Sequence, residues 1–310
     1  VIENIGDDIL GGNASDTLVG DANSNTLNGG AGDDILVGAG GADSLIGGTG
    51  NDTVSYATDS AGINVSLRNG NGIDGSGSTD NYDSIENVLG SSSNDTIEGD
   101  SGNNILNGGA GTDTLTYESS STGVTVNLSI TSQQNTVNEG LDTISNFENL
   151  TGSTGNDSLT GDDNVNVING EVGNDYIVGG KGADKLYGGT GNDTFIINDG
   201  DGNDTIDGYI DEQGDGKTDG SSSSDTVNFS SLSNKVSVDL TTNNNNAIIS
   251  DATSTTLSLT NIENIIGTNQ DDILIGNDEI NTLVGGKGND TITGNGGADK
   301  LEGNDGDDTF

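Results

Sequence analysis

The sequence predicts an all-β solenoid, and three observations lead to this fold class. A repeat of nine residues, Gly-x-x-x-x-(Asp/Asn)-x-(apolar)-x, occurs seventeen times in full and once short by a residue, mostly head to tail. The segments between the runs of repeats alternate apolar and polar residues, which is typical of strands. No helix signal of useful length is present. A repeat with one regular apolar residue cannot form a core alone, so the repeats must stack on their neighbours.

Each fixed position within the repeat has a structural reason. In Gly29-Gly-Ala-Gly-Asp-Asp34-Ile-Leu36-Val, the glycines permit a tight turn with φ above zero. Asp34, at the sixth position, directs an oxygen ligand into that turn, and Leu36, at the eighth, is expected on a very short strand. Equally regular copies begin at Gly188 and Gly285.

The repeats fall into four blocks, which alternate with three inserts. The repeats begin at Gly11, Gly20, Gly29, Gly38, Gly47, Gly90, Gly99, Gly108, Gly152, Gly161, Gly170, Gly179, Gly188, Gly267, Gly276, Gly285, Gly294 and Gly303. Two looser copies contain Asp204-Thr-Ile206 and Asp225-Thr-Val227. The predicted blocks 1 to 4 are 1–55, 90–116, 152–207 and 267–310, and the predicted inserts 1 to 3 are 56–89, 117–151 and 208–266.

A longer period overlies the nine-residue one. The sixth-position residues of blocks 1, 3 and 4 read Asp-Asn-Asp-Asp-Asp, and the short block 2 has the first three of them. They are Asp16, Asn25, Asp34, Asp43 and Asp52, then Asp95, Asn104 and Asp113, then Asp157, Asn166, Asp175, Asp184 and Asp193, and finally Asp272, Asn281, Asp290, Asp299 and Asp308. Blocks and inserts therefore form one large module that is repeated about three and a half times.

The inserts are similar to one another. Each begins near an aromatic residue, Tyr56, Tyr117 or Phe229, which we expect to cap a thin apolar core rather than to stack on a glycan. An alternating strand pattern follows at 63–67, 124–128 or 236–240, and Ile85-Glu-Asn-Val88 or an equivalent closes the insert. We therefore expect the inserts to continue the solenoid. Residues 243–246 are predicted to be a loop tip, and 211–216 only faintly resemble an EF-hand loop.

The composition indicates a cationic partner and excludes several classes of function. The chain has 51 acidic and seven basic residues and a formal net charge of −44, which argues against binding to nucleic acid or anionic membranes. It has no Cys, hence no disulfide, and with no His either, zinc and copper sites are disfavoured. An all-oxygen ligand set favours calcium. No apolar run is long enough to span a membrane.

The nonapeptide resembles the calcium-binding repeat of RTX (repeats-in-toxin) proteins. The resemblance implies a right-handed parallel β-roll in which two repeats make one coil, so that each repeat stacks on the next but one. It also implies about 7–10 calcium ions between stacked turns, held by carboxylates and by carbonyl oxygens of the Gly-Gly-x-Gly segments. Two carboxylates one strand spacing apart, about 4.8 Å, repel each other, and an ion between them reverses the sign of the interaction.

The resemblance implies two kinds of ion site in this chain. Seven pairs contain two acids: Asp16/Asp34, Asp34/Asp52, Asp95/Asp113, Asp157/Asp175, Asp175/Asp193, Asp272/Asp290 and Asp290/Asp308. Three pairs, Asn25/Asp43, Asn166/Asp184 and Asn281/Asp299, contain an Asn, which loses a charge, so we expect them to be weaker or empty. The implied glycine ligands are Gly30, Gly32, Gly48, Gly50, Gly109, Gly111, Gly180, Gly182, Gly189, Gly191, Gly286 and Gly288.

We expect no catalysis from these residues. Without His or Cys there is no Ser-His-Asp or Cys-His arrangement, and among 51 acids no glycosidase pair can be singled out.

The chain resembles large type I-secreted adhesins and RTX surface-layer proteins. That resemblance implies an extracellular or cell-surface calcium-dependent scaffold, with a saccharide or cell surface, or a second copy of the chain, as further partner. The alternatives are a self-assembling surface-layer or filament subunit and a non-catalytic region of a secreted hydrolase or alginate epimerase. The chain begins within a motif at Val1 and stops after Phe310, so we expect it to be part of a longer protein.

Overall fold

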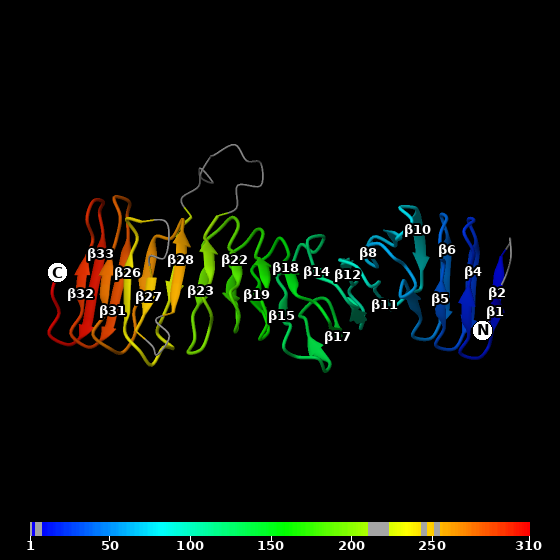
Figure 1. Cartoon of the computed structure of the whole chain (residues 1–310), viewed down its shortest axis with the longest axis horizontal. Helices are drawn as coiled ribbons and strands as arrows, with labels where there is room; N and C mark the ends of the chain where they lie inside the picture. The colour runs from blue at the N-terminus through cyan, green and yellow to red at the C-terminus, as the bar shows by residue number, and fades with distance from the viewer. Residues whose placement is uncertain (1, 4–7, 210–222, 243–246, 251–254) are drawn as a thin grey trace. The chain divides into compact units, whose positions relative to one another are not determined.

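A computed structural model describes residues 2–3, 8–209, 223–242, 247–250 and 255–310, and these residues form only strands and turns. No helix in this described part is long and apolar enough to cross a membrane. The chain divides into two compact parts, the first formed by residues 1–119 and 124–151 and the second by 120–123 and 152–310. Within each part, short strands from successive repeats lie side by side in two sheets (Figure 1).

The first part contains two sheets whose strands are mostly parallel. One has the order β1 (Ile2–Glu3), β3 (Thr17–Val19), β5 (Ile35–Val37), β7 (Thr53–Ser55), β11 (Asn87–Leu89), β13 (Ile105–Asn107), β17 (Leu141–Ser145) and β16 (Gln134–Asn135). The other has the order β2 (Ile9–Gly12), β4 (Thr26–Ala31), β6 (Ser44–Thr49), β10 (Thr79–Asp83), β9 (Asn71–Ile73), β8 (Asn64–Ser66), β12 (Thr96–Glu98), β14 (Thr114–Thr116) and β18 (Asn149–Thr151). Strand β15 (Thr125–Asn127) also belongs to this part.

The second part repeats this arrangement. Its first sheet has the order β19 (Ser158–Thr160), β21 (Tyr176–Val178), β23 (Thr194–Ile196), β25 (Thr226–Asn228), β29 (Asn264–Ile266), β31 (Thr282–Lys287) and β33 (Lys300–Asp305). Its second has the order β20 (Val167–Asn169), β22 (Lys185–Tyr187), β24 (Thr205–Asp207), β28 (Thr256–Thr260), β27 (Ala247–Ile249), β26 (Val236–Asp239), β30 (Ile273–Ile275) and β32 (Thr291–Thr293).

The register of the strands shows that two repeats make one coil. Leu18 pairs with Leu36 on one sheet, and Leu27 pairs with Leu45 on the other, so each residue meets its equivalent from the next repeat but one. These eighth-position side chains are completely buried. A ladder of single apolar side chains therefore fills the space between the two sheets, and the prediction of an all-β parallel β-roll is confirmed.

The inserts continue the sheets, with one feature that the sequence did not indicate. Strand β11 of insert 1 lies in register between β7 and β13, and β29 of insert 3 lies between β25 and β31. The predicted alternating segments form strands β8, β15 and β26. The additional feature is antiparallel pairing, since β9 pairs with β8 and β10, and β27 pairs with β26 and β28. Tyr56, Tyr117 and Phe229 are buried, so they belong to the core and present no ring to a glycan.

Candidate metal sites

The sixth-position residues form columns, because each repeat pairs in register with the next but one. The N–H of Asp16 donates to Oδ1 of Asp34, and the N–H of Asp34 donates to Oδ1 of Asp52, both at 2.7 Å. An equivalent bond, between 2.7 and 3.0 Å long, joins all ten of the predicted pairs of sixth-position residues. The structure therefore brings together every pair named from the sequence. The bond to Oδ1 fixes each carboxylate, so that its Oδ2 faces into the turn.

The first-position glycine of a repeat leaves space beside this second oxygen. A Cβ on Gly29 would lie 2.2 Å from Oδ2 of Asp34 and 2.7 Å from the carbonyl oxygen of Gly47 in the next coil. The two oxygens are therefore no more than about 5 Å apart, a span that a calcium ion with ligand distances of about 2.3–2.6 Å can bridge. Gly170 has the same relation to Asp175 Oδ2 and the carbonyl oxygen of Gly188.

Nine buried carboxylate oxygens in the described residues have no hydrogen-bond donor. They are the Oδ2 atoms of Asp34, Asp43, Asp52, Asp113, Asp175, Asp184, Asp193, Asp204 and Asp290. Each of these residues is at most 2 % exposed. An unpaired buried carboxylate is costly unless a cation or a proton compensates it. The neighbouring polar atoms include carbonyl oxygens, so the available metal ligands are all oxygen atoms. Such a ligand set fits a hard cation, and calcium is the hard cation that prefers it.

The backbone four residues before each acid explains why these oxygens are unpaired. At all nine turns that residue has a positive φ, between 71° and 116°, and its N–H does not reach the carboxylate. Gly30 precedes Asp34 in this way, and Gly189 precedes Asp193. The twelve glycines predicted as ligands all adopt φ between 91° and 147°, so their predicted turn conformation is confirmed. Their role as ligands stays a prediction.

Burial makes several of these acids, among them Asp175, Asp43 and Asp204, reluctant to ionise in the absence of a cation. Burial, together with the charges of Asp157 and Asp193, raises the pKa of Asp175 to about 8. Burial and the charge of Asp80 raise the pKa of Asp43 to about 7, and the pKa of Asp204 is raised to about 7 for similar reasons. No three acidic side chains converge within the described residues, so an ion here would complete its shell with carbonyl oxygens or water.

The columns contain seven acids that the sequence analysis did not assign to them. The N–H of Asp52 donates to Oε2 of Glu86 at 2.7 Å, and Glu148 and Glu263 accept the same bond from Asp113 and Asp225. Four further acids accept the equivalent bond at Oδ1 from the N–H of a sixth-position residue, and they are Asp80, Asp142, Asp204 and Asp225. The signal for the three Glu was the recurring Glu-Asn pair that closes each insert, and the looser repeats contained Asp204 and Asp225.

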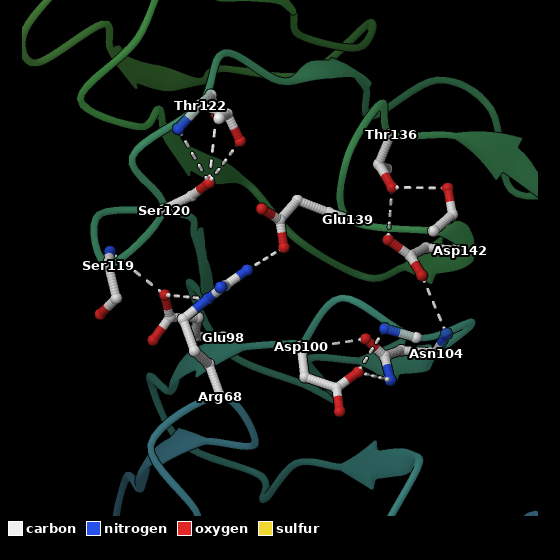
Figure 2. A network of polar contacts seen from close by, with 12 residues as sticks. Arg68, Glu98, Asp100, Asn104, Ser119, Ser120, Thr122, Thr136, Glu139 and Asp142 are labelled. Atoms are coloured by element: carbon white, nitrogen blue, oxygen red, sulfur yellow. Dashed lines mark hydrogen bonds and ion pairs between the residues drawn. The ribbon is translucent and has the colours of Figure 1, made fainter.

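In inserts 1 and 2 and in the block between them, protein groups contact several buried acids. Figure 2 shows Arg68, the single arginine of the chain, between Glu139, with which it forms an ion pair, and Glu98, whose Oε1 lies 3.7 Å from its Nε. Both glutamates are buried. Nearby, Oγ1 of Thr136 donates to Oδ2 of Asp142 at 2.7 Å. In insert 1, the Tyr56 hydroxyl likewise donates to Oδ2 of Asp80 at 2.9 Å. These acids have protein donors where the nine acids above have none.

Some predicted features lie outside the described residues. They are the EF-hand-like segment 211–216, the start of the looser repeat at 220–222, and the loop tip 243–246. Residues 4–5 also lie outside; they belong to Ile2-Glu-Asn-Ile5, which we interpret as another copy of the motif that closes each insert. Asp299 and Asp308, in the last two repeats, are described and are half-buried.

A comparison with known families adds to this geometry. The model of the RTX calcium-binding nonapeptide repeat matches residues 10–45, 37–55, 80–117, 142–177, 160–195 and 275–310, which together make up more than half of the chain. The chain belongs to this family. The RTX chain is thus a calcium-binding repeat region of the kind typical of type I-secreted extracellular proteins. The matched ranges include the turns with unpaired Oδ2 atoms except the one at Asp204. No curated protein matches the RTX chain.

Proposed function

We propose that this RTX chain is a secreted, non-catalytic scaffold or adhesive region that folds when it binds calcium outside the cell. The observation that carries the proposal is the set of nine buried carboxylate oxygens without a donor. A chain with a formal net charge of −44 and a core of single side chains is poorly suited to fold while those groups are ionised and uncompensated. Ion binding would then supply folding free energy.

Oδ2 of the unpaired acids and glycine carbonyl oxygens of the next coil would hold the ion. In the best-defined turns these are Asp34 with Gly47, Asp175 with Gly188, and Asp193 with Gly208. Calcium would supply positive charge between oxygens that otherwise repel each other. The positive-φ residue before each acid keeps an N–H from competing for the same oxygen.

The proposed scaffold role is supported by the way in which successive repeats extend the two sheets. Within each compact part, every further pair of repeats adds one strand to each of the two sheets and extends the ladder of buried side chains. The Ser, Thr and Asn-rich turns around it have no His or Cys, so nucleophilic triads and zinc chemistry have no residues to use. We therefore favour a scaffold or adhesin over an enzyme.

Small-angle scattering tests this proposal and separates it from its alternatives. A disordered chain of 310 residues has a radius of gyration of about 60 Å and a compact globule of that length about 20 Å. We expect the disordered value in chelator and, in saturating calcium, an elongated monomer with an intermediate value. Magnesium at the same concentration controls for ionic strength. A radius of gyration as small as that of the globule in calcium would contradict the scaffold proposal. Growth of the particle with protein concentration only in calcium would favour a self-assembling subunit.

A further inference from the structure

The first two repeats of every block, which form one coil, differ from the repeats that follow. In the first repeat the N–H at position two donates to Oδ2 of the sixth-position acid, as from Ser91 to Asp95 at 2.6 Å and from Thr268 to Asp272 at 2.6 Å. The same bond joins Gly12 to Asp16 and Ser153 to Asp157. None of these position-two residues has a positive φ.

A hydroxyl group adds to this arrangement in three of the four blocks. Oγ of Ser153 donates to Oδ1 of Asp157 at 2.7 Å, and Ser91 and Thr268 do the same for Asp95 and Asp272. The hydroxyl also accepts the N–H two residues further on, which holds the turn in this conformation. Asp95 and Asp272 each accept a third bond, from the N–H of Ile63 or Val236. Both oxygens of each of these two carboxylates therefore have protein donors, unlike the Oδ2 atoms of the nine acids above.

In the second repeat of each block, the sixth-position side chain is an amide, and its oxygen also accepts a hydrogen bond from the protein. The N–H at position two donates to Oδ1 of the sixth-position Asn at 2.8 or 2.9 Å, and this occurs at Asn25, Asn104, Asn166 and Asn281. Nδ2 of Asn104 donates to the carbonyl oxygen of Glu86 at 2.8 Å, and Nδ2 of Asn281 donates to that of Glu263 at 3.0 Å. The amide N–H group thus donates to a carbonyl oxygen of the stacked turn. In a calcium-binding turn, the cation would contact such an oxygen instead.

Position two of these Asn repeats is itself an Asp or Asn in all four blocks. Asp21, Asp100, Asp162 and Asn277 each accept the N–H two residues further on in an Asx turn, which keeps φ out of the positive region. By contrast, all nine acids with an unpaired oxygen follow a position-two residue with positive φ. Two turn types therefore exist, and they are distributed in the same order along every block.

From this order we infer that the first coil of each block holds no ion and that calcium-dependent coils begin at the third repeat. The inference rests on the proposed function, because it assumes that the remaining turns take calcium. The first acids that require an ion are then Asp34, Asp113, Asp175 and Asp290. The ion-free coil provides paired strands whose exposed edge can template the next coil, as expected when each repeat of a solenoid is stabilised by its neighbour. The residues at positions two and six of each repeat therefore determine which turns bind no calcium.

Ion counting on isosteric variants tests the inference. In Asp157→Asn and Asp272→Asn, the oxygen that accepts hydrogen bonds can stay in place while one charge is lost. We expect both variants to retain the calcium count of the unmodified chain in native mass spectrometry. Asp175→Asn and Asp290→Asn should each lose at least one ion. Equal losses from the first-coil and third-repeat variants would overturn the inference.

The opposite substitution, from Asn to Asp in a first coil, provides a second test in case an Asp→Asn change disturbs folding. Asn281→Asp places a carboxylate oxygen against the carbonyl oxygen of Glu263, so it should either bind one ion more than the unmodified chain or require more calcium to fold. Asn51→Asp, an exposed change of the same charge, should do neither. An Asn281→Asp variant that behaves as Asn51→Asp does would also overturn the inference. If the unmodified chain bound no calcium at all, the proposed function itself would fail, which is a different result.

Discussion

Acid should partly replace calcium in this protein. We consider the calcium-free chain, in the presence of a chelator, as the pH is lowered from 8 to 5. Burial raises the pKa of Asp113, Asp184 and Asp193 to about 6, that of Asp43 and Asp204 to about 7, and that of Asp175 to about 8. Because these pKa values are raised above those of the unfolded chain, the folded form takes up protons as the pH falls. Its stability is then full below about pH 4 and is lost as the pH rises through 6 to 8.

The magnitude follows from the size of the shifts. For Asp204, which is 2 % exposed, the pKa moves from 3.8 to about 7. At about 1.4 kcal/mol for each pKa unit, this corresponds to at most about 4 kcal/mol of lost stability at pH 8. Two or three groups of this kind equal the net stability of an ordinary domain, about 5–15 kcal/mol. The calcium-free chain should therefore be unfolded at pH 8 and gain β-structure by pH 5.

Far-ultraviolet circular dichroism measures this effect directly. We expect the β-signal in chelator to rise between pH 8 and pH 5, and the dependence to weaken in Asp204→Asn, which removes one titrating group. Asp163→Asn, at an exposed acid beside Lys181, is the control and should leave the pH dependence unchanged. A β-signal that stays constant or falls with decreasing pH would show that protonation of these buried acids does not stabilise the fold.

Two further predictions concern residues around the turns. Arg68→Met leaves Glu98 and Glu139 buried without their cation, so it should lower the free energy of unfolding in calcium by about 3 kcal/mol in urea titrations. Lys181→Met, in an exposed pair, should cost less than about 1 kcal/mol, and equal costs would contradict the assignment of Arg68 as a fixed cation. Gly29→Ala places a methyl group 2.2 Å from Oδ2 of Asp34 and should lower the calcium count. Gly40→Ala should not, because its methyl group would meet Ser76 at 3.6 Å and Ala22 at 3.9 Å, which are ordinary contacts. Unchanged calcium binding in Gly29→Ala would show that the ion does not occupy this space.

The nine-residue spacing and its resemblance to RTX repeats together predicted the fold and the columns. A fixed apolar residue at position eight permits only one inward-facing side chain per strand, so residues such as Leu18 and Leu36 had to stack and be buried. A period of two repeats per coil then places Asp34 over Asp16 and under Asp52. The stacking of the position-eight residues depends on periodicity, whereas the coil of two repeats was implied by the resemblance to RTX repeats.

The state of each turn could not be predicted from its acid. Asp95 and Asp113 are the same residue type in neighbouring coils, yet Asp95 accepts three donors and Oδ2 of Asp113 accepts none. The difference lies in φ at position two, where Ser91 stands in one repeat and Gly109 in the other. The roles of Glu86 and Arg68 were also hidden, since both depend on pairing between segments far apart in the sequence.

A calcium titration followed by far-ultraviolet circular dichroism at pH 8 shows whether calcium binding drives the folding of this chain. We expect a disordered spectrum in chelator and a cooperative gain of β-structure as free calcium reaches about 0.1–1 mM, the range of extracellular calcium modules. Magnesium at equal concentration should give much less, because it demands a smaller and more regular ligand shell. The same β-signal with and without chelator would contradict the claim that calcium compensates the nine buried carboxylate oxygens and so allows the chain to fold.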